Sequence, residues 1–278
     1  MSFAGLRVLS LESRRAKEME ALVLRHQGQP FVAPSVNEKP LDDNTEVFSW
    51  AERLFAGNFD LAVFMTGAGL AYLKDALLTR YPVERLSAAL NSLTVVCRGP
   101  KPAVLLHELG VKARIQIAEP NTWREIVPVL AARPERRITI QEYGKPNLEF
   151  VTALEALGAQ VDSVAIYRWD FPDDLGPLEE AVRRIALRQT DVVIFTTSIQ
   201  LVHLYEIAGR MGLEAEVRQA LANDLAVASV GPIMTAALVE QGLEPDIVPA
   251  HPKMGILVRA AAEQAATVLE RKRARLNR

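Results

Sequence analysis

The chain has 278 residues, of which 49% are hydrophobic and 24% are charged. This length and composition allow a sizeable buried core and are typical of a soluble globular protein with one large or two ordinary domains. The formal net charge of −2 gives no overall attraction to nucleic acid or to an anionic membrane surface, so neither is an expected partner.

The N-terminal residues do not form a basic segment followed by a long apolar one, and every apolar run is shorter than the ~18 residues of a membrane span. We therefore expect a cytoplasmic protein that is not bound to a membrane. Cys97 is the single cysteine, which excludes an internal disulfide, and its apolar context indicates a core thiol. The four histidines are scattered, so we expect no metal site.

Short β-branched runs alternate along the chain with segments of helical period, which is the pattern of βα units and a mainly parallel sheet. The expected strands, in chain order, are Leu6–Leu11, Leu61–Met65, Thr94–Arg98, Arg137–Gln141, Val192–Thr196 and Leu225–Val230. Ser13 is expected to N-cap a helix that ends at Gly28. Gly110, Gly158 and Gly242 occupy positions where a glycine is expected after the C-terminus of a helix.

Three segments resemble later segments at nearly one offset. The aligned pairs are Asp60–Leu73 with Asp191–Leu204, Leu93–Gly110 with Leu225–Gly242 and, more weakly, Arg7–Pro34 with Arg137–Val164. The second pair places the corner Gly99-Pro100 on Gly231-Pro232. Three matches in the same order indicate two related α/β halves, and a generic βαβ rhythm is the alternative.

Open α/β sheets bind ligands beyond the carboxyl ends of their strands, so two similar lobes predict a cleft bordered by strand-to-helix turns. These turns are Thr66–Gly69, Arg98–Pro102, Glu142–Asn147, Thr196–Gln200 and Val230–Met234, with His251–Gly255 before the last helix. A helix N-terminus presents unpaired N–H groups that suit carboxylate or phosphate, although each turn alone could simply be a good helix cap. Arg98, Lys101, Lys145, Arg168 and Lys253 lie in or near the turns, and a ligand with several carboxylates would fit this array.

The chain lacks a dinucleotide fingerprint, a P-loop, a nucleophile elbow and a thiol motif. An enzyme with this sequence would act by holding its substrate in shape, without a cofactor or a covalent nucleophile. Tyr167 follows an apolar run and precedes a polar stretch typical of a domain connection. Its ring could cover a strand end, or its phenol could face the cleft and donate a hydrogen bond to a leaving hydroxyl. Trp169 is interpreted as linker packing.

The sequence resembles the uroporphyrinogen-III synthase family from about Arg7 to Ala265. The matching features are FTTSIQ, the VGP…AL…GL.PD segment (Val230–Asp246), HPKMG.L before the last helix, QEYGKPN and the segment around Tyr167. The resemblance implies two similar flavodoxin-like or Rossmann-like α/β lobes with mainly parallel sheets, joined by two extended linkers. Residues 1–36 and 171–278 would form the first lobe and residues 37–170 the second, in a monomer.

The resemblance also implies an activity and a site. The family's enzymes are lyases of tetrapyrrole, and hence porphyrin and haem, biosynthesis. They cyclise hydroxymethylbilane to uroporphyrinogen III with inversion of ring D, and they need no metal or organic cofactor. Tyr167 would be the catalytic residue. The implied substrate-binding residues are Thr66, Gly67, Ala68, Arg98, Gly99, Lys101, Tyr143, Gly144, Lys145, Thr197, Ser198, Ile199, Gly231, Pro232, Ile233, Met234 and Lys253.

The chain departs from the family's pattern after Gly231-Pro232. Similar proteins commonly have threonine at one or both of the next positions, whereas this chain has Ile233 and Met234, with Thr235 one place later. A non-catalytic, hinged tetrapyrrole-binding or regulatory module is therefore the alternative to an active enzyme. The basic tail Glu270–Arg278 is interpreted as the solvated end of a long helix, with partner contact as the alternative.

Overall fold

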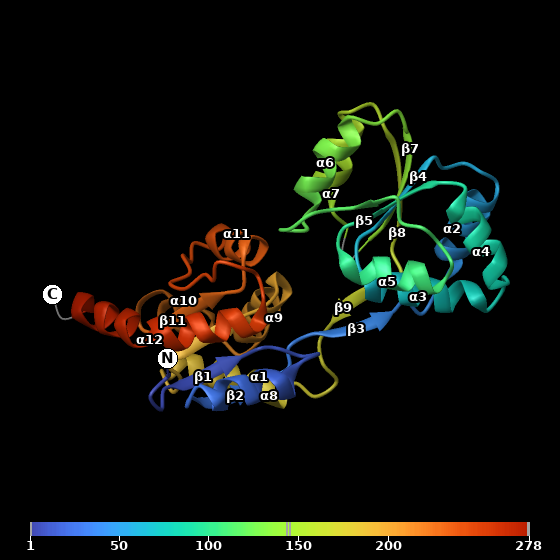
Figure 1. The fold of residues 1–278 in the computed structure, drawn as a ribbon. Coiled ribbons are helices and arrows are strands. Elements are labelled where there is room, and N and C mark those ends of the chain that lie inside the picture. Colours follow the sequence, from blue (N-terminus) through green and yellow to red (C-terminus); the bar gives the residue numbers. More distant parts are fainter. Residues whose placement is uncertain (1, 143, 145, 277–278) are drawn as a thin grey trace. The chain divides into compact units, whose positions relative to one another are not determined.

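A computed structural model describes residues 2–142, 144 and 146–276. Two of the expected substrate-binding residues, Tyr143 and Lys145, lie outside the described residues. The chain divides into two compact units, which are described one at a time (Figure 1). Unit 1 combines Met1–Asn37 with Asp170–Arg278, and unit 2 consists of Glu38–Trp169.

Unit 1 contains a parallel sheet with the strand order β11-β10-β1-β2. The strands are β1 (Arg7–Ser10), β2 (Gln29–Val32), β10 (Val192–Phe195) and β11 (Ala226–Ser229). The helices are α1 (Ala16–Arg25), α8 (Gly176–Ala186), α9 (Ser198–Arg210), α10 (Glu214–Asn223), α11 (Pro232–Glu240) and α12 (Met254–Leu276). All residues of β10 and β11 are buried, as is usual for parallel strands that helices cover on both faces.

Alternate residues of β10 enter two different cores, because successive side chains of a strand point to opposite faces. Val193 and Phe195 pack with residues of α8, α9, α10 and α11. Val192 and Ile194 pack with residues of α1 and α12. The sheet of unit 1 is therefore the middle layer of three.

Unit 2 contains a parallel sheet with the strand order β6-β5-β4-β7-β8. The strands are β4 (Leu61–Phe64), β5 (Thr94–Cys97), β6 (Ile115–Gln116), β7 (Arg137–Gln141) and β8 (Gln160–Val164). The helices are α2 (Thr45–Phe55), α3 (Gly67–Leu78), α4 (Val83–Asn91), α5 (Pro100–Glu108), α6 (Trp123–Ala131) and α7 (Leu148–Glu155). Figure 1 shows α6 and α7 on one side of this sheet and α2 to α5 on the other, in agreement with the two cores that flank it.

The two sheets share one pattern of strand order and register. In unit 1, Val8 of β1 lies opposite Val192 of β10, and in unit 2 Ile138 of β7 lies opposite Leu61 of β4. These are the pairs that the sequence repeat equates. Strands β1 and β2 thus correspond to β7 and β8, and strands β10 and β11 correspond to β4 and β5. The expected relationship between two α/β halves is present in the fold.

An ion pair at the start of the central strands is also repeated. In unit 1 the Arg7 guanidinium contacts the Asp191 carboxylate at 2.9 Å, and the Arg7 N–H donates to the same carboxylate. In unit 2 Arg137 contacts Asp60 at 2.5 Å, again with its backbone N–H donating to the carboxylate. Each ion pair therefore connects the first residue of one strand to the residue that precedes the neighbouring strand.

The chain passes between the units through two extended segments, β3 (Asn37–Pro40) and β9 (Tyr167–Asp170). These strands pair with each other in a two-stranded sheet. Beside them, the Leu41 N–H donates to the Ile166 carbonyl at 3.1 Å. The two connections are therefore extended, as the resemblance to the family implied.

The six expected strands are all present, with ends that differ by at most one residue. Gly110, Gly158 and Gly242 follow helices and have positive φ angles, as expected. The prediction for the first helix was wrong, because α1 begins only at Ala16 and the Ser13 hydroxyl instead accepts hydrogen bonds from the N–H groups of residues 35 and 36. At the other end of α1, Gln27 and not Gly28 has the positive φ angle.

The interpretation of the basic tail as solvated was also wrong at one residue. Lys272 is only 6% exposed, and its ammonium group lies 2.7 Å from the Asp246 carboxylate. It also donates to the carbonyl of Leu225 at 2.7 Å and to that of Leu221 at 3.3 Å. The tail therefore holds α12 against the rest of unit 1.

Candidate functional site

The expected turns of unit 2 leave a single edge of its sheet. Strand β4 lies between β5 and β7, and all three strands run parallel. Their carboxyl ends lead into Thr66–Gly69, Arg98–Pro102 and Glu142–Asn147, respectively. In unit 1, β10 and β11 are likewise parallel neighbours that lead into Thr196–Gln200 and Val230–Met234.

Thr66 forms the N-cap of α3, because its hydroxyl oxygen accepts the Gly69 N–H at 3.0 Å. The Thr66 N–H donates to the side-chain oxygen of Gln141 at 3.3 Å. Within the described part of the chain, the Gly67 and Ala68 N–H groups have no acceptor. These two groups, at the positive end of the helix dipole, are available for an anion.

Tyr167 is brought to this turn by β9. Its phenol oxygen lies 3.4 Å from the Thr66 hydroxyl oxygen, and either atom can be the donor. The Tyr167 side chain is only 3% exposed, and its ring centroid lies 5.8 Å from that of Tyr72. The ring of Tyr167 is therefore part of a core, and its phenol contacts the turn; a role of the phenol toward a leaving hydroxyl stays a prediction.

The second turn of unit 2 depends on side-chain charge more than on backbone donors. Pro100 and Pro102 have no N–H group, so Lys101 supplies the one donor among the first three residues of α5. The Lys101 side chain is exposed. With the Asn121 amide in the orientation that satisfies both of its ends, its nitrogen donates to the Arg98 carbonyl at 3.0 Å and supports the turn.

The third turn of unit 2 lies against an aromatic ring. Gly144 has a φ of +68°, and a Cβ atom there would overlap the indole of Trp169. Glycine is thus required for both its conformation and its size. Trp169 packs against this turn as well as occupying the connection. Asn147 N-caps α7 by accepting the Phe150 N–H at 3.1 Å.

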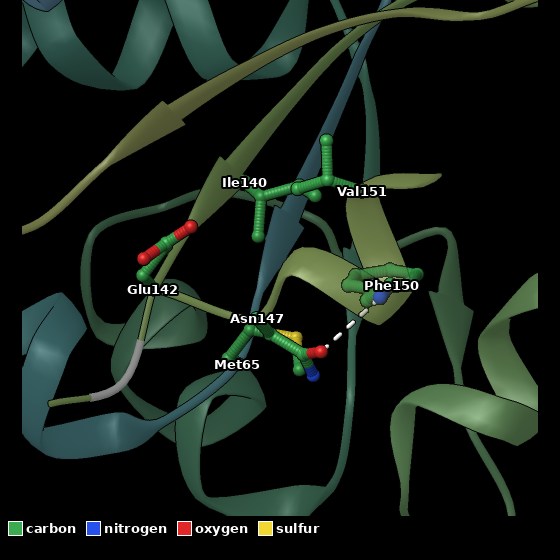
Figure 2. Close-up of a pocket in the computed structure, with 6 residues that line it drawn as sticks. All are labelled: Met65, Ile140, Glu142, Asn147, Phe150 and Val151. Atoms are coloured by element: carbon green, nitrogen blue, oxygen red, sulfur yellow. Dashed lines mark hydrogen bonds between the residues drawn. The ribbon is translucent and has the colours of Figure 1, made fainter. Parts of the chain in front are cut away.

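A small pocket adjoins this third turn (Figure 2). It is lined by Met65, Ile140, Glu142, Asn147, Phe150 and Val151. Burial raises the pKa of the Glu142 carboxyl, while hydrogen bonds from the Ser163 side chain and the Asn147 backbone act in the opposite direction. The pocket lies on the α6 and α7 face of the sheet, whereas Tyr167 belongs to the core on the other face. It is therefore separate from the pair of Thr66 and Tyr167.

The Thr197 turn of unit 1 resembles the Thr66 turn, with a different supporting residue. The side-chain oxygen of Gln200 accepts the Thr196 N–H at 2.8 Å and the Thr197 N–H at 3.3 Å. In the part of the chain that the structure describes, the N–H groups of Ser198 and Ile199 have no acceptor. Two adjacent N–H groups are therefore available here, as at Gly67 and Ala68.

The Gly231-Pro232 corner presents an apolar side chain where the resemblance to the family predicts hydroxyls. Ile233 is 42% exposed, and Met234 is buried at 1% exposure. The Thr235 hydroxyl lies 2.9 Å from that of buried Ser229, so it does not replace the missing hydroxyls at the surface. A Cβ atom at Gly231 would lie 2.8 Å from Pro252, which places the segment that carries exposed Lys253 against this corner.

Among the described residues, no group of three or more His, Cys, Asp and Glu residues is placed to hold a metal ion. None of the helices in that part of the chain combines the length and apolarity of a membrane span. Cys97 is free and buried, and burial raises the pKa of its thiol to about 12.

Sequence reasoning identified the turns but missed the amide side chains that support them. Gln141, Gln200 and Asn121 accept or donate hydrogen bonds at three different turns. Gln141 and Gln200 lie in or beside expected turns, so position was a weak signal. Gln200 completes a capping box with Thr197, so the local pattern T-x-x-Q could have identified it. Gln141 instead acts on Thr66 from a neighbouring strand, which no local pattern shows.

Two α/β units with parallel sheets define a doubly wound protein, and the helix N-termini at one strand edge of each sheet are chemically suited to an anionic ligand. A model of the family described as uroporphyrinogen-III synthase HemD matches residues 17–259. The chain belongs to this family, which places it in tetrapyrrole biosynthesis.

Known relatives match nearly the whole chain. An uncharacterised protein of Bacillus subtilis, YjjA, is 25% identical over 261 residues, which cover 91% of this chain and 94% of the relative. The crystal structure of a mutant uroporphyrinogen III synthase from Thermus thermophilus has a TM-score of 0.71 at 22% identity, and the match covers 95% of this chain and 100% of that one. The synthetase from Helicobacter pylori has a TM-score of 0.51 at 15% identity, with 95% and 99% covered. At these identities the solved structures establish the fold.

Proposed function

We propose that the protein is an active uroporphyrinogen-III synthase, a lyase that cyclises hydroxymethylbilane with inversion of ring D and without a metal or organic cofactor. The observation that carries the proposal is the hydrogen-bonding contact of Tyr167 with Thr66 at the strand-end edge of unit 2, in a chain of this family.

The turns would bind the acetate and propionate groups of the substrate. Gly67 and Ala68 in one unit, and Ser198 and Ile199 in the other, offer pairs of N–H groups without acceptors in the described chain. Exposed Lys101 supplies positive charge. Each charge-assisted hydrogen bond shielded from water would contribute roughly 1.5–3 kcal/mol. The other expected binding residues, Arg98, Gly99, Tyr143, Gly144, Lys145, Thr197, Gly231, Pro232, Ile233, Met234 and Lys253, belong to the same proposal.

Tyr167 would assist departure of the terminal hydroxyl. Because its side chain is 3% exposed while Thr66 is only partly buried, we infer that the phenol acts through the Thr66 hydroxyl. The C–O bond breaks as the electron pair of the pyrrole nitrogen forms the azafulvene, while the threonine donates a hydrogen bond to the leaving oxygen. The oxygen leaves as water after taking a proton from solvent, and the pyrrole N–H returns a proton to solvent, so that the net change is loss of water. Attack at the substituted carbon of ring D then gives the spiro intermediate, which fragments and recloses.

Analysis of the product isomer tests the proposal. Unassisted cyclisation of hydroxymethylbilane gives the uninverted type I isomer, so a reaction without protein is the matched control. Incubation with the protein is expected to give mostly type III, which chromatography of the oxidised porphyrins separates from type I. If the protein yields only type I, the enzyme proposal is lost.

One observation favours the second candidate, a non-catalytic tetrapyrrole-binding or regulatory module. The first turn of α11 presents exposed Ile233 and buried Met234 in place of hydroxyl donors. Binding of the tetrapyrrole without formation of type III would favour this candidate. In either case we propose a cytoplasmic monomer with lobes that divide at residues 36/37 and 170/171, and gel filtration tests the monomer.

A further inference from the structure

A buried glutamine oxygen accepts the N–H of the strand-end threonine in both units. In unit 2 the donor is Thr66 and the acceptor is Gln141, which is 2% exposed. In unit 1 the donor is Thr197 and the acceptor is Gln200, which is 1% exposed. The sequence repeat equates the two threonines. The two glutamines, in contrast, are not at equivalent positions.

The two glutamine side chains approach equivalent threonines from different elements, a helix in unit 1 and a strand in unit 2. Gln200 lies on α9, three residues after Thr197, and its position in the repeat corresponds to Gly69 of α3. Gln141 lies at the end of β7, and its position corresponds to Leu11. The Gln200 amide nitrogen donates to the Leu11 carbonyl at 3.2 Å. The Gln200 side chain of unit 1 therefore ends beside Leu11, which is the residue equivalent to Gln141 of unit 2.

Gly69 and Gln141 are complementary in shape. A Cβ atom at Gly69 would overlap the side-chain amide of Gln141, so the glycine leaves the space that the amide fills. The Gln141 amide nitrogen donates to the Glu142 carbonyl, which sets the orientation of the amide with its oxygen toward Thr66. Where unit 1 has a glutamine on the helix, unit 2 thus has a glycine on the helix and a glutamine on the strand.

We propose that Gln141 is a positioning residue that holds the Thr66 peptide, and with it the Thr66 hydroxyl, in contact with the Tyr167 phenol. The inference rests on the proposed function for its effect on turnover. The peptide N–H of Thr66 is directed inward to Gln141, which leaves Gly67 and Ala68 as the donors for substrate. The Thr66 hydroxyl oxygen accepts from Gly69 and lies 3.4 Å from the phenol, so rotation of this peptide would break the contact.

The test transfers the arrangement of unit 1 into unit 2. Gln141→Leu removes the amide and introduces the residue found at the equivalent position of unit 1. The double variant Gly69→Gln/Gln141→Leu restores an amide from the helix side. Gln141→Met is a second loss variant with nearly the original side-chain volume, in case the others fold poorly. Hydrogen exchange of the Thr66 amide, kcat and KM are measured for each variant, with circular dichroism to verify folding.

We expect Gln141→Leu and Gln141→Met to exchange the Thr66 amide faster and to lower kcat about tenfold, with a smaller change in KM. The double variant is expected to recover both the protection of the Thr66 amide and most of the kcat. Because Gln141→Met would already weaken the contact with Tyr167, Tyr167→Phe should lower kcat by only about another tenfold in that background, which is less than its effect in the wild-type protein.

Unchanged protection of Thr66 and unchanged kcat in a folded Gln141→Met variant would overturn the inference. So would a folded double variant that recovers neither. Amide exchange needs no substrate, so it tests the role of Gln141 even if the wild-type protein forms no type III product. Failure of the proposed function and failure of this inference are therefore distinguishable.

Discussion

The phenol oxygen of Tyr167 lies 3.4 Å from the hydroxyl oxygen of Thr66. A residue of the connecting strand β9 therefore contacts the N-cap of α3, the helix that follows β4. Tyr167 is held rigidly because its ring is buried, and Thr66 is held because it caps α3. The pair is therefore preorganised before any substrate arrives, which favours a role in stabilising a leaving group.

Tyr167→Phe removes the phenol and keeps the ring. We expect kcat for type III formation to fall about 100-fold, the lower end of the usual contribution of acid catalysis, with the fold intact. Steady-state kinetics with hydroxymethylbilane measures the change. Tyr72→Phe is the matched control, because its ring neighbours Tyr167 while its own hydroxyl donates to the Glu38 carbonyl. Equal rates for wild type and Tyr167→Phe would reduce Tyr167 to a packing residue.

Thr66→Val and Thr66→Ser separate the hydroxyl of this residue from its shape. Valine keeps the volume but loses the cap and the contact with Tyr167, so we expect a loss of about 1 kcal/mol in stability and a fall in kcat similar to that of Tyr167→Phe. Serine keeps the hydroxyl and should retain most of the activity. Urea unfolding and kinetics measure the two effects. Wild-type turnover in a folded Thr66→Val variant would contradict a relay through threonine.

The strands and the duplication were predictable because both can be recognised from short segments of the sequence, without knowledge of how those segments pack. Strands such as Val192–Phe195 are short apolar runs between helical segments, and the repeat equates Asp60 with Asp191 whatever the surrounding packing. The start of α1 was not predictable in this way, because Ser13 has a typical capping side chain that is occupied by backbone N–H groups 22 and 23 residues later in the chain.

The side chains that support the strand-end turns show the same limit of prediction from local sequence more clearly. Alignment of the repeats pairs Gln200 with Gly69, which suggests that an amide has been lost from unit 2. The structure places the Gln141 amide in that space instead. A compensation between a helix and a neighbouring strand has no signature within either segment, so it becomes visible only when the two segments are placed side by side.

Glu135 predicts a specific response to acid. Hydrogen bonding by the Arg133 guanidinium, opposed by burial and aided by Thr94, lowers the pKa of this carboxyl to about 2. Its folded-state pKa is therefore below the usual glutamate value of 4.5, so its stabilisation is present above that value and is lost as the pH falls toward 2. The free energy of unfolding of wild type and Glu135→Gln should differ most near neutral pH and converge as the pH approaches 2. Urea titrations across this range measure it, and a difference independent of pH would contradict the assignment.

Lys272 and Asp246 predict how α12 is held. Their side chains are each 7% exposed, and the ammonium and carboxylate groups lie 2.7 Å apart. Lys272→Met removes the buried partner of Asp246, which keeps an ion pair with the exposed Arg271 at 3.3 Å, and it leaves two carbonyls without their lysine donor. We therefore expect a loss of about 3 kcal/mol, the lower end for a broken buried pair. The double variant Lys272→Met/Asp246→Asn removes both charges and retains an acceptor for the Val227 N–H, so it should be markedly more stable than the single variant.

Urea unfolding followed by circular dichroism measures both variants of this pair. Arg273→Met is the control for position, because it removes a basic residue in the last turn of the same helix where the side chain is exposed. Surface substitutions of this kind change stability by only about 0.5 kcal/mol. If Lys272→Met were as mild as Arg273→Met, the buried ion pair would not secure α12. If the double variant were no more stable than Lys272→Met, the loss would come from the unpaired carbonyls and not from the buried carboxylate that has lost its lysine.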